Sequence, residues 1–74
     1  MNTIQVFRTD VSDLDVAVNI VLLLEGCYAH CRVNFDLEDC DRILRIESAQ
    51  YSIEETAVQW LVAGYGYHCE PLPE

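Results

Sequence analysis

The stretch that decides the fold is "FRTDVSDLDVAVNI", which runs from Phe7 to Ile20. It opens with the end of an alternating apolar and polar segment, Ile4 to Thr9, and this alternation predicts a β-strand. A short polar turn follows, in which Ser12 or Asp13 can cap a helix that begins near Leu14. The stretch therefore predicts a strand, a tight turn and an apolar helix in immediate succession.

The apolar residues of this helix recur at helical spacing. Ala17, Ile20, Leu24 and Cys27 fall on one stripe, and the helix is expected to end between Gly26 and Ala29. A reduced cysteine on such a stripe behaves as a small hydrophobic residue. The pattern therefore predicts that Cys27 is a core or near-core thiol.

The middle of the chain predicts a β-hairpin. In "CRVNFDL", Cys31 to Leu37, alternate residues are apolar, which indicates a second strand and places Cys31 on its apolar face. Residues 38–41, "EDCD", form a polar turn before a third strand, Arg42 to Ile46. The two strands are joined by a loop of about four residues.

The last third predicts a second helix and a final strand. Ser52 followed by Glu55 is a capping-box pattern, which opens a helix from Ile53 to about Ala63. Gly64 is expected to stop that helix in the left-handed conformation. The segment 67–72, "YHCEPL", is a short strand that suits a sheet edge, because proline cannot donate a hydrogen bond to a neighbouring strand.

The predicted order is strand, helix, strand, strand, helix, strand. Residues 1–74 are too few for more than one domain. The fold class is α+β, a ferredoxin-like βαββαβ sandwich with a four-stranded antiparallel sheet and two helices on one face.

At this point the sequence resembles a heavy-metal-associated domain, the small copper-chaperone fold, over nearly the whole chain. Three stretches carry the resemblance: the strand, turn and helix of residues 7–20, the second strand "VNFDL" (33–37), and "SIEETAVQWLVAGYGYHCE" (52–70), with its Ala-Gly-aromatic end. The metal-binding Cys-x-x-Cys motif of the family falls on Asp13 and Val16. The resemblance therefore implies the fold but not copper(I) or zinc transfer, which needs exchangeable thiolates.

The remaining cysteines and histidines are the alternative ligands. In this fold one end of the domain would hold Asp13, Asp15, Cys40, His68 and Cys69. The weak candidates for ligands of Zn(II) or Cu(I) are four of these residues: Asp13, Cys40, His68 and Cys69. The hairpin and the last strand lie at opposite sides of the sheet, however, and the adjacent His68 and Cys69 point to opposite faces. At the far end, Cys27, His30 and Cys31 match no strong zinc spacing, and His30 reads as an ordinary turn histidine. The acidic hairpin does not follow the EF-hand pattern.

The charge is strongly negative. Thirteen acidic residues face four basic ones, giving a formal net charge of −9. This balance argues against nucleic acid and anionic lipid as partners; it suits solubility, a basic partner or cations. No long apolar run or signal peptide is evident, so we expect no membrane contact and a cytoplasmic location with reduced cysteines.

Both predicted helices carry more apolar residues than a single core stripe needs. The additional residues are Val16, Val18, Val21 and Leu22 in the first helix and, besides Ala57 and Trp60, Val58, Leu61 and Val62 in the second. Either a tightly packed core takes most of them, or they form an apolar surface for a protein partner or a homodimer. The open edge of the second strand offers another contact.

No nucleophile–base pair or phosphate-binding glycine loop stands out, so no enzyme activity, catalytic residue or cofactor is expected. The sequence favours a non-enzymatic binding or assembly module with a degenerate metal loop. The alternative is a divergent metal-binding or metal-trafficking protein that uses Cys40, Cys69 and nearby acids. A small-ligand regulatory domain of the ACT type shares the element order, but no motif supports it.

Overall fold

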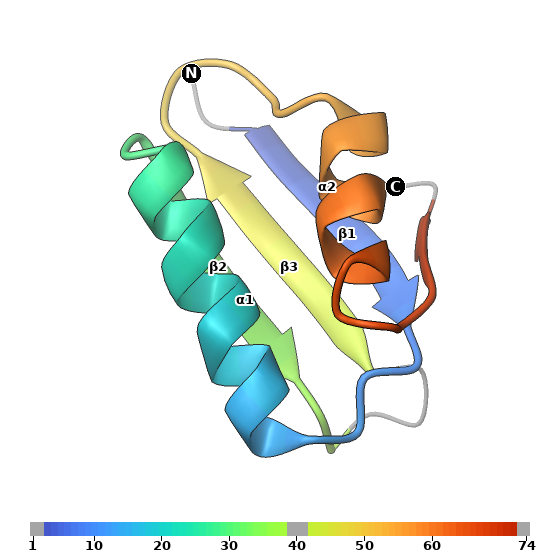
Figure 1. Cartoon of the computed structure of the whole chain (residues 1–74). Coiled ribbons are helices and arrows are strands. Elements are labelled where there is room, and N and C mark those ends of the chain that lie inside the picture. Colours follow the sequence, from blue (N-terminus) through green and yellow to red (C-terminus); the bar gives the residue numbers. More distant parts are fainter. Residues whose placement is uncertain (1–2, 39–41, 73–74) are drawn as a thin grey trace.

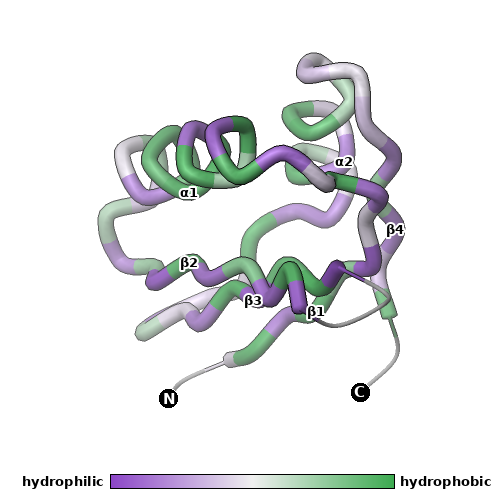
Figure 2. The backbone as a smooth tube through the Cα atoms, turned by 90° about the horizontal axis from the view of Figure 1, so that it is seen from below, coloured by the Kyte–Doolittle hydropathy of each residue, from purple (hydrophilic) through white to green (hydrophobic). Residues whose placement is uncertain are grey.

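The computed structural model describes residues 3–38 and 42–72. Its elements are β1 (Thr3–Thr9), α1 (Leu14–Cys27), β2 (Cys31–Asp36), β3 (Ile43–Ser48), α2 (Glu55–Ala63) and β4 (Cys69–Pro71). The strands form one antiparallel sheet in the spatial order β2-β3-β1-β4 (Figure 1). Both helices lie on the same face of that sheet (Figure 2). The predicted α+β class, with a four-stranded antiparallel sheet and two helices, is confirmed and is compatible with a ferredoxin-like fold.

The register of the sheet follows the hydrophobic pattern. β1 pairs with β3 from Thr3 opposite Ser48 to Arg8 opposite Ile43. On its other side β1 pairs with β4, where Phe7 lies opposite Pro71. β2 and β4 are therefore the two edges, which confirms that the hairpin and the last strand lie at opposite sides of the sheet. β3 extends two residues beyond the predicted end, and residues 39–41 of the predicted turn lie outside the described part.

The core lies between the sheet and the helices. Phe7, Leu44 and Ile46 point from the two central strands toward the helices and are fully buried, as alternation along a strand requires. Ala17, Ile20 and Leu24 meet them from α1, as the predicted stripe requires. The rest of the core cluster consists of Val11, Cys31, Val33, Ile53, Val58, Val62 and Cys69.

α1 begins and ends where expected, but one residue of its stripe is misplaced. Asp13, rather than Ser12, is the N-cap. The prediction that Cys27 is a core or near-core thiol is wrong, because its side chain is exposed. Cys27 is the last residue of the helix, and the next residue, Tyr28, packs against the core. The chain leaves the helix there, so the periodic stripe does not continue to its final position.

α2 begins two residues later than predicted, and its capping box does not form. Glu54 is the N-cap and makes no side-chain capping bond. Ile53 is buried and bonded to Gln5 of β1: its N–H donates to Oε1 at 2.9 Å, and its C=O accepts from Nε2 at 2.7 Å. These bonds hold Ile53 outside the helix, so Ser52 cannot cap it. At the other end Gly64 is right-handed (φ −62°), and Gly66 takes the left-handed conformation (φ +88°).

Candidate functional site

The turn between β1 and α1 is held by its own acidic side chains. Asp13 Oδ1 accepts a hydrogen bond from the Asp15 N–H at 2.9 Å, where the positive end of the helix dipole favours a carboxylate. Asp10 Oδ1 accepts from the His68 N–H at 2.6 Å, and the Asp10 N–H donates to the His68 carbonyl at 3.3 Å. The first turn and the segment before β4 therefore lie at the same end of the domain, as predicted.

Cys69 is a poor metal ligand in this environment. Its side chain is buried on the helix-facing side of β4. Burial, with a smaller contribution from the negative charge of Glu70, raises the pKa of Cys69 from 9.0 to about 12. Because the thiolate is the form that binds soft metals, a thiol that stays protonated at neutral pH binds them weakly.

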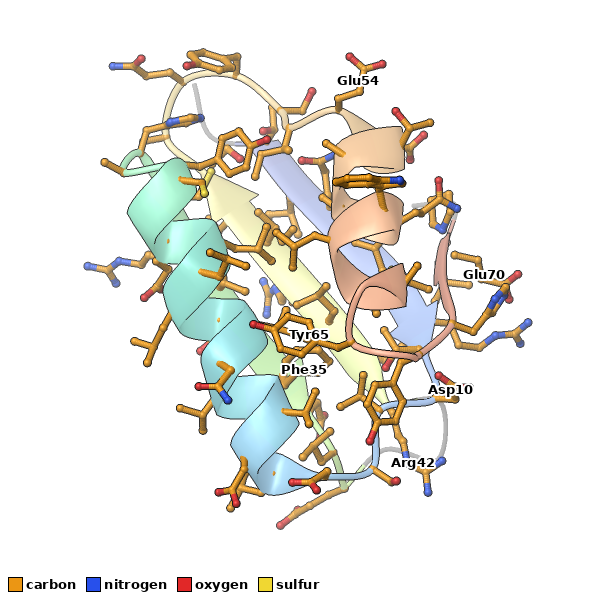
Figure 3. All side chains as sticks on the ribbon, in the orientation of Figure 1. Asp10, Phe35, Arg42, Glu54, Tyr65 and Glu70 are labelled. Atoms are coloured by element: carbon orange, nitrogen blue, oxygen red, sulfur yellow. The ribbon has the colours of Figure 1, made fainter. Side chains whose placement is uncertain are left out.

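The other ligand candidates do not join Cys69. His68 is exposed on the opposite face, where its Nε2 lies 3.9 Å from Glu70 Oε2. Glu70 also pairs with Arg8 of the neighbouring strand, and Figure 3 shows it at the β4 edge. Cys40 lies outside the described residues. Within 3–38 and 42–72, no three histidine, cysteine or acidic side chains gather closely enough to hold a metal ion. The donor set described does not fit zinc or copper(I).

The far end holds thiols and rings rather than a ligand set. Cys31 is buried, as predicted, and its Sγ lies 3.2 Å from Ser48 Oγ. The ring of His30 lies 4.3 Å from that of Tyr51 and 6.3 Å, edge-on, from that of Tyr28. Its Nε2 is buried, and no described group bonds to it. His30 is thus a turn histidine held between aromatic rings.

The helices expose a set of large apolar side chains. Trp60 is 83% exposed, Leu14 67% and Leu22 62%. We call the following residues the outer helical surface: Leu14, Val18, Leu22, Leu23, Trp60 and Tyr65. The core takes Val58 and Val62 fully and Val16, Val21 and Leu61 partly. In α2 the additional apolar residues are thus the buried ones, whereas Trp60 is exposed.

Two apolar grooves run beside α1. One, of about 480 Å³, separates α1 from α2 and is lined by Leu23, Tyr28, Ala57, Trp60, Leu61, Gly64 and Tyr65. Tyr65 points from the end of α2 toward α1 (Figure 3). The other, of about 310 Å³, lies between α1 and the edge strand β2, with Leu14, Val18, Leu22, Phe35 and Leu37 among its lining residues. We refer to this second hollow as the edge groove.

Three of the four arginines lie on the face of the sheet away from the helices, and the fourth, Arg42, lies beside the end of β1, where its carbonyl accepts a hydrogen bond from Thr9 Oγ1 (Figure 3). Residues 10–31, which include α1, and residues 46–74, which include α2, contain no lysine or arginine. Arg8, Arg32 and Arg45 alternate with buried residues of their strands, so they lie on the open face of the sheet. The helical side therefore combines apolar side chains with acidic neighbours, among them Asp15 and Glu25.

Sequence reasoning missed three features of this site. It did not single out Leu23 or Tyr65, which line a groove only because the helices lie side by side. It also missed Glu25, whose Oε2 accepts a hydrogen bond from the Val33 N–H of β2 at 3.0 Å. No local pattern marks a bond between the last turn of a helix and the outer edge of the next strand, so the sequence held no indication of it.

Comparison of the chain with protein-family models gave no match, and comparisons with curated proteins and with solved structures gave none either. Among the residues described, no helix combines the length and apolar character needed to cross a membrane.

Proposed function

We propose that this chain is a non-enzymatic protein-binding module of ferredoxin-like βαββαβ topology, whose contact surface is the outer helical surface. The observation that carries the proposal is Trp60, the only tryptophan in the chain, which is 83% exposed beside an apolar groove. Tryptophan and tyrosine are enriched among the residues that dominate binding energy at protein interfaces. An apolar surface of this kind on a small domain is typical of an interaction site.

The heavy-metal-associated resemblance remains part of the proposal as a fold relationship only. The element order and the sheet order support it. The position that the family uses for its first metal-binding cysteine holds Asp13, which caps α1. A reducing, cytoplasmic location is proposed with it, because Cys27, Cys31 and Cys69 are all thiols. Among the described residues no observation favours the metal-trafficking alternative, and Cys40, on which it partly rests, lies outside them.

The proposal is tested with a photo-crosslinking residue placed at Trp60 in the full chain and, as a control, at Arg45 on the open sheet face. A partner captured at position 60 but not at position 45 is purified, and its affinity is measured for the wild type and for Trp60→Ala. We expect Trp60→Ala to weaken binding by about tenfold or more, as at other aromatic interface anchors. A second copy of this chain as the captured protein would identify a homodimer. Equal capture at positions 60 and 45 would contradict the proposal, and so would an equal affinity of the wild type and Trp60→Ala for the captured partner.

A further inference from the structure

The outer edge of β2 is only partly occupied. The Val33 N–H is bonded to Glu25 and the Cys31 N–H to the Tyr28 carbonyl at 2.9 Å, so these groups point away from β3. In an antiparallel pair the hydrogen-bonding direction alternates along the strand. Phe35, two residues after Val33, therefore directs its N–H and C=O away from β3, to the same open edge. Among the described residues, no group on that side bonds to them.

The edge groove lies directly beside this open position. Leu14, Val18 and Leu22 line it from α1 at spacings of four residues, which places them on one face of the helix. Eight residues of helix extend about 12 Å. Three to four residues of an extended chain cover a similar length, at about 3.3 Å per residue. An added strand that pairs with Phe35 would thus place its alternate side chains along the groove.

The charges around the groove select the occupant. Asp13 and Asp15 lie at the start of α1 and Glu25 in its last turn, and no basic residue lies between them. Asp15 and Glu25 are separated by about 15 Å of helix, which corresponds to about five residues of an extended chain. A second copy of this chain carries a net charge of −9 and is repelled. A segment with basic residues at both ends of an apolar stretch is attracted.

We propose that the β2 edge at Phe35 and the edge groove bind an extended segment of a partner protein by strand addition. The segment carries alternate apolar residues flanked by basic residues. Glu25 sets the register, because its bond to the Val33 N–H ends the open part of the strand and its carboxylate receives a basic side chain. This inference rests on the proposed function, since it gives one part of the outer helical surface a specific occupant.

The test uses the blocked peptide acetyl-Arg-Thr-Val-Thr-Val-Thr-Arg-amide, in which both arginines and both valines share one face of a strand. It is added at millimolar concentration to the full, ¹⁵N- and methyl-labelled chain. We expect saturable shifts of the Phe35 amide and of the Leu14, Val18 and Leu22 methyl groups, with the Trp60 indole unmoved. Methylating both valine nitrogens, or replacing both arginines by glutamate, should weaken binding by at least about tenfold.

Two variants of α1 supply a matched pair. Val18→Lys places a positive charge in the groove and should abolish binding, whereas Asn19→Lys adds the same charge to an exposed position that does not line the groove. Shifts confined to Trp60 and Tyr65 would overturn strand addition at β2 and leave the proposed function standing. Three other results would each overturn the inference. They are peptide binding that persists after N-methylation, the absence of any shift on adding the peptide, and self-association that protects the Phe35 amide without peptide.

Discussion

Replacing Glu25 by alanine should open the edge of β2. The Glu25 carboxylate reaches from the last turn of α1 to the Val33 N–H at 3.0 Å and covers a group that would otherwise face a neighbouring chain. Unpaired N–H and C=O groups on an edge strand are a template for pairing with another molecule, and native proteins often cover them with charged side chains. Glu25→Ala removes this cover and leaves the rest of the sheet intact.

The size of the effect follows from one charge-assisted hydrogen bond. Such bonds contribute about 1.5–3 kcal/mol, and because Glu25 is half-buried we expect the low end, about 1.5 kcal/mol of the free energy of unfolding. The higher helix propensity of alanine offsets a few tenths of a kcal/mol of this loss in the free energy of unfolding. The Val33 amide should exchange its hydrogen about tenfold faster, since each 1.4 kcal/mol is one factor of ten. Glu25→Gln keeps an acceptor and should show a smaller change.

Three measurements on each variant test this reasoning: urea unfolding, residue-resolved hydrogen exchange, and sedimentation velocity over a range of concentrations. Glu54→Ala is the matched control, because it removes an exposed carboxylate that makes no capping bond. Glu25→Ala should expose the Val33 amide and Glu54→Ala should not, and both variants should sediment as the wild type does, because a second strongly acidic copy is repelled. If the Val33 amide exchanged equally fast in the wild type and Glu25→Ala, the carboxylate would not cover this edge in solution.

Three further outcomes are expected. A thiol reagent at neutral pH, read out by peptide mapping, should modify Cys27 quickly and Cys69 only on unfolding, and equal labelling of both thiols would contradict the burial of Cys69. Because the pKa of Cys69 is raised from 9.0 to about 12, the free energy of unfolding should fall as the pH rises through this window. The Cys69→Ala variant should lack that dependence on pH. Gln5→Ala leaves two backbone groups of Ile53 unpaired and should cost about 2 kcal/mol in urea unfolding, and a loss below about 0.5 kcal/mol would show that water replaces both bonds. Asp13→Ala should cost about 1 kcal/mol and Asp13→Ser almost nothing, whereas equal losses would mean that the carboxylate does more than cap α1.

The sequence predicted what local periodicity and turn chemistry control. The alternation of β1 placed Phe7 in the core, and the helical spacing of Ala17, Ile20 and Leu24 placed α1 over the sheet. The polar turn gave the start of α1 to within one residue, because an N-cap side chain acts on its own helix. Each of these predictions depends on residues that are close in the chain.

The wrong predictions concern places where the packing of the folded chain overrides a local pattern. The capping box at Ser52 is a valid local pattern, but Gln5 lies 48 positions from Ile53 and holds it outside the helix. The stripe through Cys27 failed for a related reason, because the chain turns after α1 and Tyr28 takes the core position. A single sequence carries no record of such tertiary bonds, so local propensity was overridden at these sites.

The two edges of the sheet are protected to different degrees, and this difference bears on where a partner can bind. β4 is short, ends in Pro71 and carries the ion pair between Glu70 and Arg8, all of which discourage further pairing. β2 is longer, and the bonds described on its outer edge are those of the Cys31 and Val33 N–H groups. Its open portion coincides with the apolar groove and with the side of the domain that lacks basic residues. Strand addition to this sheet should therefore be confined to β2, at Phe35, and should favour a basic segment over a second copy of the chain.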